Sequence, residues 1–272
     1  MTATKGGWDL PISERELTSL TGEMEQAHRE TLPLLQSSAV DLAAEIRSRR
    51  AAGPEAVNPD RRRFLFGTGG VAAALVLAAC SSGTSDSKSS SSPSMSGSSA
   101  AASGQYTGDL KVVALATALE NQAVGAYQAA LDAAGAGKLG TVPPAVGNFI
   151  TTAMAQHADH AKAWNAVLTG AGKAAITTVP LSNQAEVTAA LGKATDVGAV
   201  AKLALQLEDQ AAQTYLFATY NVTSPAGIAT AATIAPVEAM HAAILNYVLG
   251  QYPVPNDFLP VDKAASPSLL TV

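Results

Sequence analysis

The stretch LEDQAAQTY at residues 207–215 places the carboxylate of Glu208 among alanine, leucine and glutamine side chains. A near copy, LENQAVGAY, stands at residues 119–127 and places Glu120 at the same relative position. Small or apolar residues three and four positions from each glutamate predict that both carboxylates lie on the apolar face of a helix. The repeat therefore indicates two related helices that each carry one carboxylate into the interior.

The region around these stretches has the apolar spacing of helices and no alternating strand pattern, which predicts an all-α fold. Glycine and proline breakers divide it into four long helices, expected at about residues 109–134, from TVPP (141–144) to TGAGK (169–173), 196–220 and 225–251. We expect Ser224 to cap the fourth helix, Pro225 to occupy its first turn and Pro236 to kink it.

The connections predict how these helices are arranged. Short loops within the first pair and within the second pair make each pair an antiparallel hairpin. The about twenty-five residues at 171–195, with a short helix expected at 182–191, permit a crossover between the second and third helices. HAKAWNAVLTG from His160 resembles HAAILNYVLG from His241, so the two hairpins are expected to be related by a pseudo-twofold axis.

All histidines after Cys80, and three of the four glutamates there, fall into one pattern across the four helices. The helices carry, in order, Glu120; His157 and His160; Glu208; and Glu238 and His241. A spacing of three places two side chains about 60° apart on one helix face, so each pair can converge on one ion. The pattern therefore predicts a metal site built from all four helices.

The predicted burial of these carboxylates requires a compensating charge. A buried ionised carboxylate costs several kcal/mol unless it is paired. All eight arginines lie at or before Arg63, so the segment from Cys80 onward offers no guanidinium partner. Lys202 lies six residues before Glu208, about 120° away around the helix. We therefore expect metal cations to compensate the carboxylates.

Carboxylate-bridged di-metal bundles use one Glu from each of two helices and a Glu-x-x-His pair from each of the other two. By this pattern residues 109–252 resemble the ferritin-like superfamily, in particular exported actinobacterial ferritin-like domain proteins. The resemblance implies a ferritin-like four-helix bundle with the long crossover between helices two and three. It also implies the ligand roles: lone ligands Glu120 and Glu208, terminal imidazoles His160 and His241, and bridging carboxylate Glu238.

The second helix departs from the family pattern, because His157 stands where a second bridging glutamate is expected. His157 stays in the predicted ligand set, since Gln156 and Asp159 point about 100° away from the two histidines of this helix. Three carboxylates against two divalent ions leave a formal charge of +1, so the second ion should bind more weakly or one metal should be favoured. The resemblance implies two divalent ions; iron is expected, with manganese or zinc as alternatives.

Tyr127 and Tyr215 follow Glu120 and Glu208 by seven residues, two turns along the same helix face. One interpretation is that they hydrogen-bond the ligands or act as redox tyrosines. The other is core packing with a satisfied hydroxyl, which is also our expectation for the ring of Trp164.

An export signal is predicted ahead of the bundle. Residues 61–80, RRRFLFGTGGVAAALVLAAC, place arginines before an apolar run of about fifteen residues, which is short for a membrane span. Arg61 and Arg62 resemble a twin-arginine signal, and the final LAAC resembles a lipobox, which implies a lipid on Cys80. The alternative is an uncleaved signal anchor.

The segments on either side of the bundle read as linker and tail. Residues 81–108 are expected to be a flexible linker, since thirteen serines fall in residues 81–103 and almost nothing there is apolar. Residues 253–272 are expected to form an extended C-terminal tail.

The first sixty residues precede the predicted signal and are therefore expected on the cytoplasmic side. Residues 13–50 read as a partly amphipathic helix interrupted at Pro33. Three alternatives stay open: the segment is removed on processing, it contacts a partner, or the true start is Met24.

Together these patterns predict a lipoprotein of the cell envelope, anchored to the outer face of the cytoplasmic membrane through Cys80, exported by the twin-arginine translocase, and forming a homodimer or an envelope complex. A net charge of -5 argues against nucleic acid as a partner. The expected function is a di-metal centre, either di-iron or mixed Fe/Mn, with ferroxidase activity or reduction of O2 or peroxide. The alternative is a non-catalytic metal-binding or structural lipoprotein on a degenerate scaffold.

Overall fold

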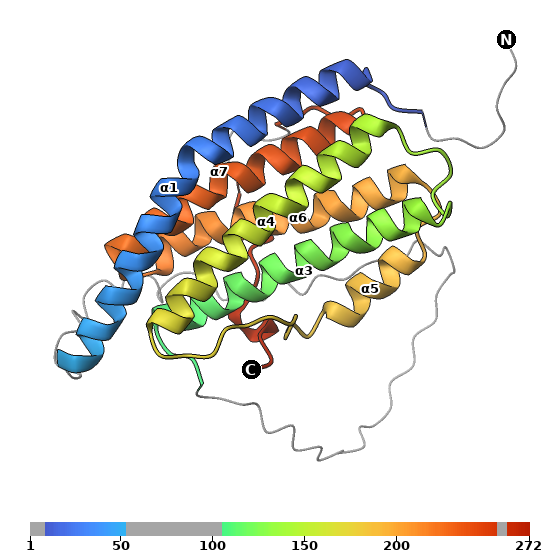
Figure 1. The fold of residues 1–272 in the computed structure, drawn as a ribbon. Helices are drawn as coiled ribbons and strands as arrows, with labels where there is room; N and C mark the ends of the chain where they lie inside the picture. The colour runs from blue at the N-terminus through green and yellow to red at the C-terminus, as the bar shows by residue number, and fades with distance from the viewer. Residues whose placement is uncertain (1–8, 53–104, 255–259) are drawn as a thin grey trace, which may run out of the picture.

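The computed structural model describes residues 9–52, 105–254 and 260–272 (Figure 1). The helices are α1 (Glu14–Ala52), α3 (Asp109–Gly135), α4 (Pro144–Gly170), α5 (Gln184–Gly192), α6 (Val197–Asn221), α7 (Pro225–Val248) and the 3-10 helix η2 (Pro267–Leu269). Within these described ranges there is no strand beyond an isolated bridge between Leu181 and Leu270. The predicted all-α class is confirmed. Arg61, Arg62, Cys80 and the serine-rich residues 81–103 lie outside the described residues.

Helices α3, α4, α6 and α7 form the bundle, and each begins and ends within a few residues of its predicted bounds. Helices α3 and α4 pack as one antiparallel hairpin and α6 and α7 as the other (Figure 1). The start of α3 lies beside the end of α6, where the backbone N–H of Thr223 donates to Asp109 Oδ1 at 3.0 Å. The connection from α4 to α6, with α5 in it, runs back along the bundle as the predicted crossover (Figure 1).

Side chains at the helix starts explain where the second hairpin begins. Asp196 accepts from the backbone N–H of Ala199 at 2.7 Å and caps α6. Ser224 accepts from the N–H of Gly227 at 3.2 Å and caps α7, as predicted, with Pro225 as the first helical residue. Helix α7 continues through Pro236. By length and composition α7 could cross a membrane, but 56% of its apolar stretch of 18 residues is buried inside the bundle.

Helix α1 packs along the bundle as a fifth helix, against both α4 and α7 (Figure 1). Its buried apolar face consists of Leu17, Met24, Leu35, Ala39, Leu42, Ala43 and Ile46. The predicted interruption at Pro33 is wrong, because α1 is one continuous helix of 39 residues. Burial of apolar residues on both sides of Pro33 outweighs the one backbone hydrogen bond that proline cannot make.

The two ends of α4 are capped by side chains of α1. Pro143 gives α4 no side-chain cap, and Glu14 Oε2 accepts instead from the N–H of Ala145 at 3.1 Å. At the other end Arg47 donates to the carbonyl of Gly170 at 2.5 Å and Arg50 donates to that of Ala171 at 2.8 Å. An acid at the first turn and bases at the last carbonyls also suit the helix dipole. Helix α1 therefore runs parallel to α4.

The C-terminal residues 260–272 lie against α6 and the crossover. The N–H of Ala265 donates to Thr214 Oγ1 at 2.7 Å, and Lys263 pairs with Asp209 at 2.7 Å. The apolar core is split into two main clusters, one around Trp164 and the other around Phe149. Polar side chains occupy the helix turns between these clusters.

Candidate metal centre

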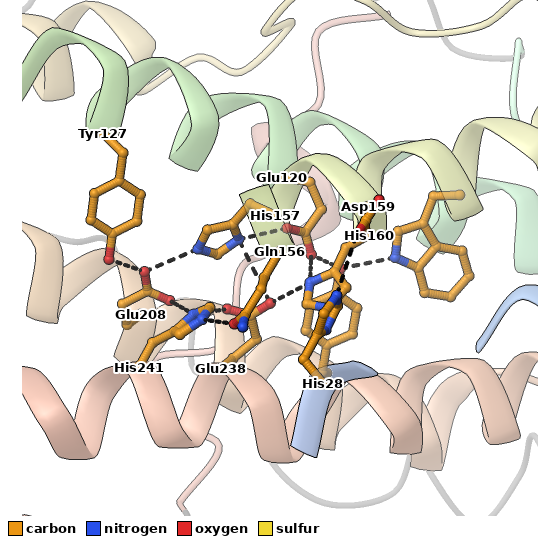
Figure 2. Close-up of polar contacts among 12 residues, drawn as sticks. His28, Glu120, Tyr127, Gln156, His157, Asp159, His160, Glu208, Glu238 and His241 are labelled. Atoms are coloured by element: carbon orange, nitrogen blue, oxygen red, sulfur yellow. Dashed lines mark hydrogen bonds and ion pairs between the residues drawn. The ribbon is translucent and has the colours of Figure 1, made fainter. Parts of the chain in front are cut away.

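The six predicted ligands meet in the middle of the bundle (Figure 2). Each side chain is at most 2% exposed. The residues come one from α3, two from α4, one from α6 and two from α7: Glu120, His157, His160, Glu208, Glu238 and His241. Helical spacing thus placed all six side chains correctly on the interior faces.

The six side chains divide into two overlapping sets that each could hold a metal ion. One set is Glu120, His157, His160 and Glu238, and the other is His157, Glu208, Glu238 and His241. Within each set the ligand atoms lie within 4.8 Å of one another. Both sets contain His157 and Glu238, so these two residues lie between the two candidate metal positions.

Glu238 presents one carboxylate oxygen to each terminal histidine. Oε1 lies 2.8 Å from His160 Nδ1, and Oε2 lies 3.1 Å from His241 Nδ1. His241 Nδ1 also lies 3.2 Å from Glu208 Oε2. The Nδ1 atoms of both histidines therefore face the centre, and Glu238 lies between them.

His157 connects the two lone glutamates. Its Nδ1 lies 2.7 Å from Glu120 Oε2 and its Nε2 lies 3.0 Å from Glu208 Oε1 (Figure 2). The imidazole thus lies between the two lone glutamates, at the position where the resemblance implies a second bridging carboxylate. Unlike a carboxylate, it joins Glu120 to Glu208 through two hydrogen bonds in the absence of metal.

Some of the buried polar atoms lack hydrogen-bond partners. Such atoms indicate where a metal ion could bind. Among the described residues, both ring nitrogens of His160 and Oε1 of Glu238 make no hydrogen bond. His160 Nδ1 and Glu238 Oε1 are 2.8 Å apart without hydrogen-bond geometry. A cation bound beside both atoms would satisfy them, since buried polar atoms are normally paired. The mixed imidazole and carboxylate donors also suit iron, manganese or zinc.

Charge at the centre is balanced in a way that the sequence did not indicate. Three imidazoles face the three carboxylates, so metal cations are not the sole available compensation. Burial lowers the pKa of His160, but the carboxylates of Glu120 and Glu238 outweigh it and raise that pKa to about 9. Burial raises the pKa of Glu120, but His160 and His157 outweigh it and lower that pKa to about 2. A metal ion must therefore compete with protons for these histidines.

The two tyrosines donate to the ligand glutamate of the opposite helix. Tyr127 of α3 donates to Glu208 Oε1 at 2.5 Å, and Tyr215 of α6 donates to Glu120 Oε1. Burial and the neighbouring carboxylates raise the pKa of both hydroxyls well above the usual value, which keeps them protonated donors. Trp164, expected to serve only in packing, donates to Tyr215 Oη at 2.9 Å.

Further contacts come from residues that the sequence did not single out as part of the site. Gln156 belongs to neither metal set, but its Oε1 lies 2.8 Å from His241 Nε2. His28 of α1 lies beside His160, with ring centroids 5.3 Å apart. Helical periodicity could not predict this contact of His28, because its neighbour on α4 is more than 130 residues away in the chain.

Small pockets between α3 and α6 reach the centre. One is lined by Glu120 and His157 together with apolar residues and one glutamine from each helix, Gln122 and Gln210. The other is mainly apolar, with Tyr127 and Glu208 as its polar lining residues, and Leu191 of α5 also lines it. Helix α1 covers the opposite side, between α4 and α7.

The comparison with known families agrees with this geometry. A family model described as a ferritin-like domain matches residues 108–251, which span the bundle and include all six predicted ligands. No curated protein and no solved structure matches the chain.

Proposed function

We propose that the chain, which belongs to the ferritin-like domain family, binds two divalent metal ions in its bundle and uses them in oxidation chemistry. The observation that carries the proposal is the pair of buried ligand sets sharing His157 and Glu238. One position would be held by Glu120 and His160, and the other by Glu208 and His241. Glu238 would contribute to both positions.

The proposed activity is ferroxidase activity or reduction of O2 or peroxide. Bound iron would supply the two electrons that, with two protons, reduce one hydrogen peroxide to two water molecules. The chain holds the ligands in place for this chemistry, since the hydroxyls of Tyr127 and Tyr215 fix one oxygen of each lone glutamate. The pockets between α3 and α6 are the proposed route for a small oxidant.

We also propose attachment to the cell envelope through a lipid on Cys80 after export by the twin-arginine translocase. This proposal is supported by the sequence of residues 61–80. Packing of α1 against the bundle requires both to lie on one side of the membrane. The described packing therefore belongs to the chain before translocation, or to chains that are not translocated. A homodimer or an envelope complex remains the proposed assembly.

His157 favours a second candidate function, a structural or non-catalytic metal-binding module. Its two hydrogen bonds already join Glu120 and Glu208 at the centre. A bundle with this link has its central carboxylates paired without metal. In this case the chain would bind metal without turnover, or not bind it at all.

Metal content and oxidation of the full chain test the proposal. We expect two metal ions per chain after loading with Fe(II), and an absorbance change when air or peroxide is added. Bound metal without oxidation would favour the second candidate, and no bound metal would exclude the first.

A double variant tests the ligand set. Replacing Glu208→Gln and His241→Asn together should remove metal binding from at least one position. Glu186→Gln is the matched control, because Glu186 is the one glutamate after Cys80 outside the site and its side chain is exposed on α5. Unchanged stoichiometry in the double variant would reject the assigned ligands.

A further inference from the structure

Helix α1 presents two polar side chains to α4 at the level of the metal centre. Glu25 Oε2 accepts from Gln156 Nε2 at 2.7 Å, and His28 Nε2 lies 3.4 Å from Asp159 Oδ2. Glu25 and His28 are three residues apart, which places them on one face of α1. Their partners on α4 are the neighbours of the predicted ligands His157 and His160.

The contact with Glu25 determines which way the amide of Gln156 points. A carboxylate accepts but does not donate, so the NH2 group of Gln156 must face Glu25. The carbonyl Oε1 then faces His241 Nε2, 2.8 Å away, and accepts its proton. His241 Nδ1 then faces Glu208 and Glu238 and donates to these carboxylates, so the Nδ1 proton is the one that a metal ion would replace. Through Gln156, Glu25 thus holds the ring of His241 with Nδ1, and not Nε2, directed at the proposed metal centre.

His28 contacts the other terminal histidine, His160. The rings of His28 and His160 meet edge to face with centroids 5.3 Å apart. His28 is only 3% exposed, although it belongs to a helix whose opposite face is in solvent. Val237 occupies the position on α7 that corresponds to Gln156, so the hairpin repeat supplies no amide for His160. The ring of His28 covers His160 in its place.

The sequence of the bundle also allows α1 to pack closely against the end of α4. A Cβ atom on Gly170 of α4 would lie 2.7 Å from the Cβ of Ala43, so only glycine allows α1 this close. Together with the caps that Glu14, Arg47 and Arg50 give α4, this contact fixes the position of α1 along the bundle.

We propose that α1 positions both terminal histidines of the metal centre, Glu25 acting on His241 through Gln156 and His28 acting on His160 by direct contact. This inference rests on the proposed metal binding. Glu25 and His28 are positioning residues and not ligands, since neither belongs to the ligand sets. Groups that orient a metal-binding histidine typically change metal affinity by about 10-fold to 100-fold.

The order of the segments along the chain allows cleavage to separate α1 from the bundle. Helix α1 precedes residues 61–80, and the bundle follows them. A chain cut ahead of Cys80 and separated from α1 would keep all six ligands but lose Glu25 and His28. Metal loaded into the uncut chain would then be held more weakly after cleavage.

Variants of Glu25 in the full-length chain test the proposal. Glu25→Ala should weaken Zn(II) binding by about 10-fold. Glu25→Gln should retain most of the affinity, because its amide oxygen can still accept from Gln156. Glu30→Ala and Glu30→Gln remove the same charge from an exposed position of the same helix and should leave Zn(II) affinity unchanged. Circular dichroism of each variant establishes that the comparison is made between folded chains.

A spectrum separates positioning from a general effect on stability. Co(II) replaces Zn(II) in such sites, and its visible absorption reports the ligand geometry. Glu25→Ala should change the Co(II) spectrum, while Glu25→Gln and both Glu30 variants keep it. His28→Phe, which retains a ring against His160, should perturb the spectrum less than His28→Ala.

The outcomes distinguish this inference from the proposed function. If the wild-type chain binds neither Zn(II) nor Co(II), the proposed metal centre is wrong and the role of α1 falls with it. If the wild-type chain binds both metals and Glu25→Ala and His28→Ala leave affinity and spectrum unchanged, the metal centre stands and the role of α1 is wrong. Equal losses in the Glu25 and Glu30 variants would likewise overturn the specific role of Glu25.

Discussion

The hairpin α3–α4 and the hairpin α6–α7 carry the same side chains at two of three ligand positions. Glu120 corresponds to Glu208 and His160 corresponds to His241, but His157 stands where α7 has Glu238. The two residues that differ are the two that both metal sets share. The two hairpins therefore carry the same residue types where a side chain belongs to one ligand set, and different types where it belongs to both sets.

Groups around the ligands have diverged further. Tyr215 receives a hydrogen bond from Trp164, whereas Leu245, at the corresponding position of α7, has no donor to give. His241 has Gln156 beside it, and His160 has the ring of His28. Two metal positions with similar ligands but different surroundings should differ in affinity and in accessibility.

Removing the shared carboxylate should have the largest effect on both positions. Glu238→Gln takes the common partner from His160 and His241, which are fully buried. Breaking a buried ion pair costs about 3 to 5 kcal/mol, so the metal-free chain should lose about this much unfolding free energy in urea. Metal analysis should show both ions lost. Two ions retained by Glu238→Gln would show that Glu238 does not bridge.

A His157→Glu substitution, which makes the two hairpins alike, should destabilise the metal-free chain and strengthen metal binding. His157→Glu adds a fourth carboxylate and removes the imidazole that pairs with Glu120 and Glu208. The metal-free chain should lose about 3 kcal/mol, because buried like charges then face one another. The second metal ion should bind more tightly, as isothermal titration would measure. An unchanged metal-free stability would mean that the pairs of His157 are not important.

In the metal-free chain, His160 and Glu120 of the first hairpin should stabilise the fold over different pH ranges. The pKa of His160 is raised to about 9, so its stabilisation is complete below its unfolded value of about 6.5 and is lost as pH rises through 9. The pKa of Glu120 is lowered to about 2, so its stabilisation is present above about 4.5 and is lost as pH falls through 2.

Unfolding free energy in the presence of a chelator should therefore be highest between about pH 4.5 and 6.5 and decline by about 2 to 3 kcal/mol toward pH 9. His160→Gln should flatten the decline at high pH. A profile that is flat from pH 6 to 9 in the wild-type chain would contradict the pairing of His160 with its carboxylates.

The tyrosines provide the smallest expected difference between the hairpins. Tyr127→Phe and Tyr215→Phe each remove one hydrogen bond to a ligand carboxylate, at a cost of about 1 to 2 kcal/mol. Tyr215→Phe should cost about 1 kcal/mol more, because it also leaves the indole N–H of Trp164 without its acceptor. Thermal unfolding of both variants measures this difference, and equal costs would show that the Trp164 contact contributes little.

Much of this site could be predicted from the sequence because helical spacing is regular. The two repeats and the three-residue spacing of His157 and His160, and of Glu238 and His241, sufficed to place all six side chains on interior faces. Contacts that depend on how helices are rotated against each other could not be read in this way. The crossed hydrogen bonds of Tyr127 and Tyr215 are of this kind.

Helix α1 shows a second limit of the sequence. Its own pattern predicted a helix, but proline rules predicted an interruption at Pro33 that tertiary packing overrides. Its place in the bundle depends on contacts with residues more than 120 positions away, such as Arg50 with Ala171. Local periodicity carries no information about such partners.

Native mass spectrometry of the full-length chain after exposure to Fe(II) tests the central claim most directly, with Glu186→Gln as control. We predict two metal ions on the wild-type chain and on the control, and fewer on the chain that carries both Glu208→Gln and His241→Asn. A wild-type chain that binds no metal, or a double variant that binds as many ions as the wild type, would contradict it.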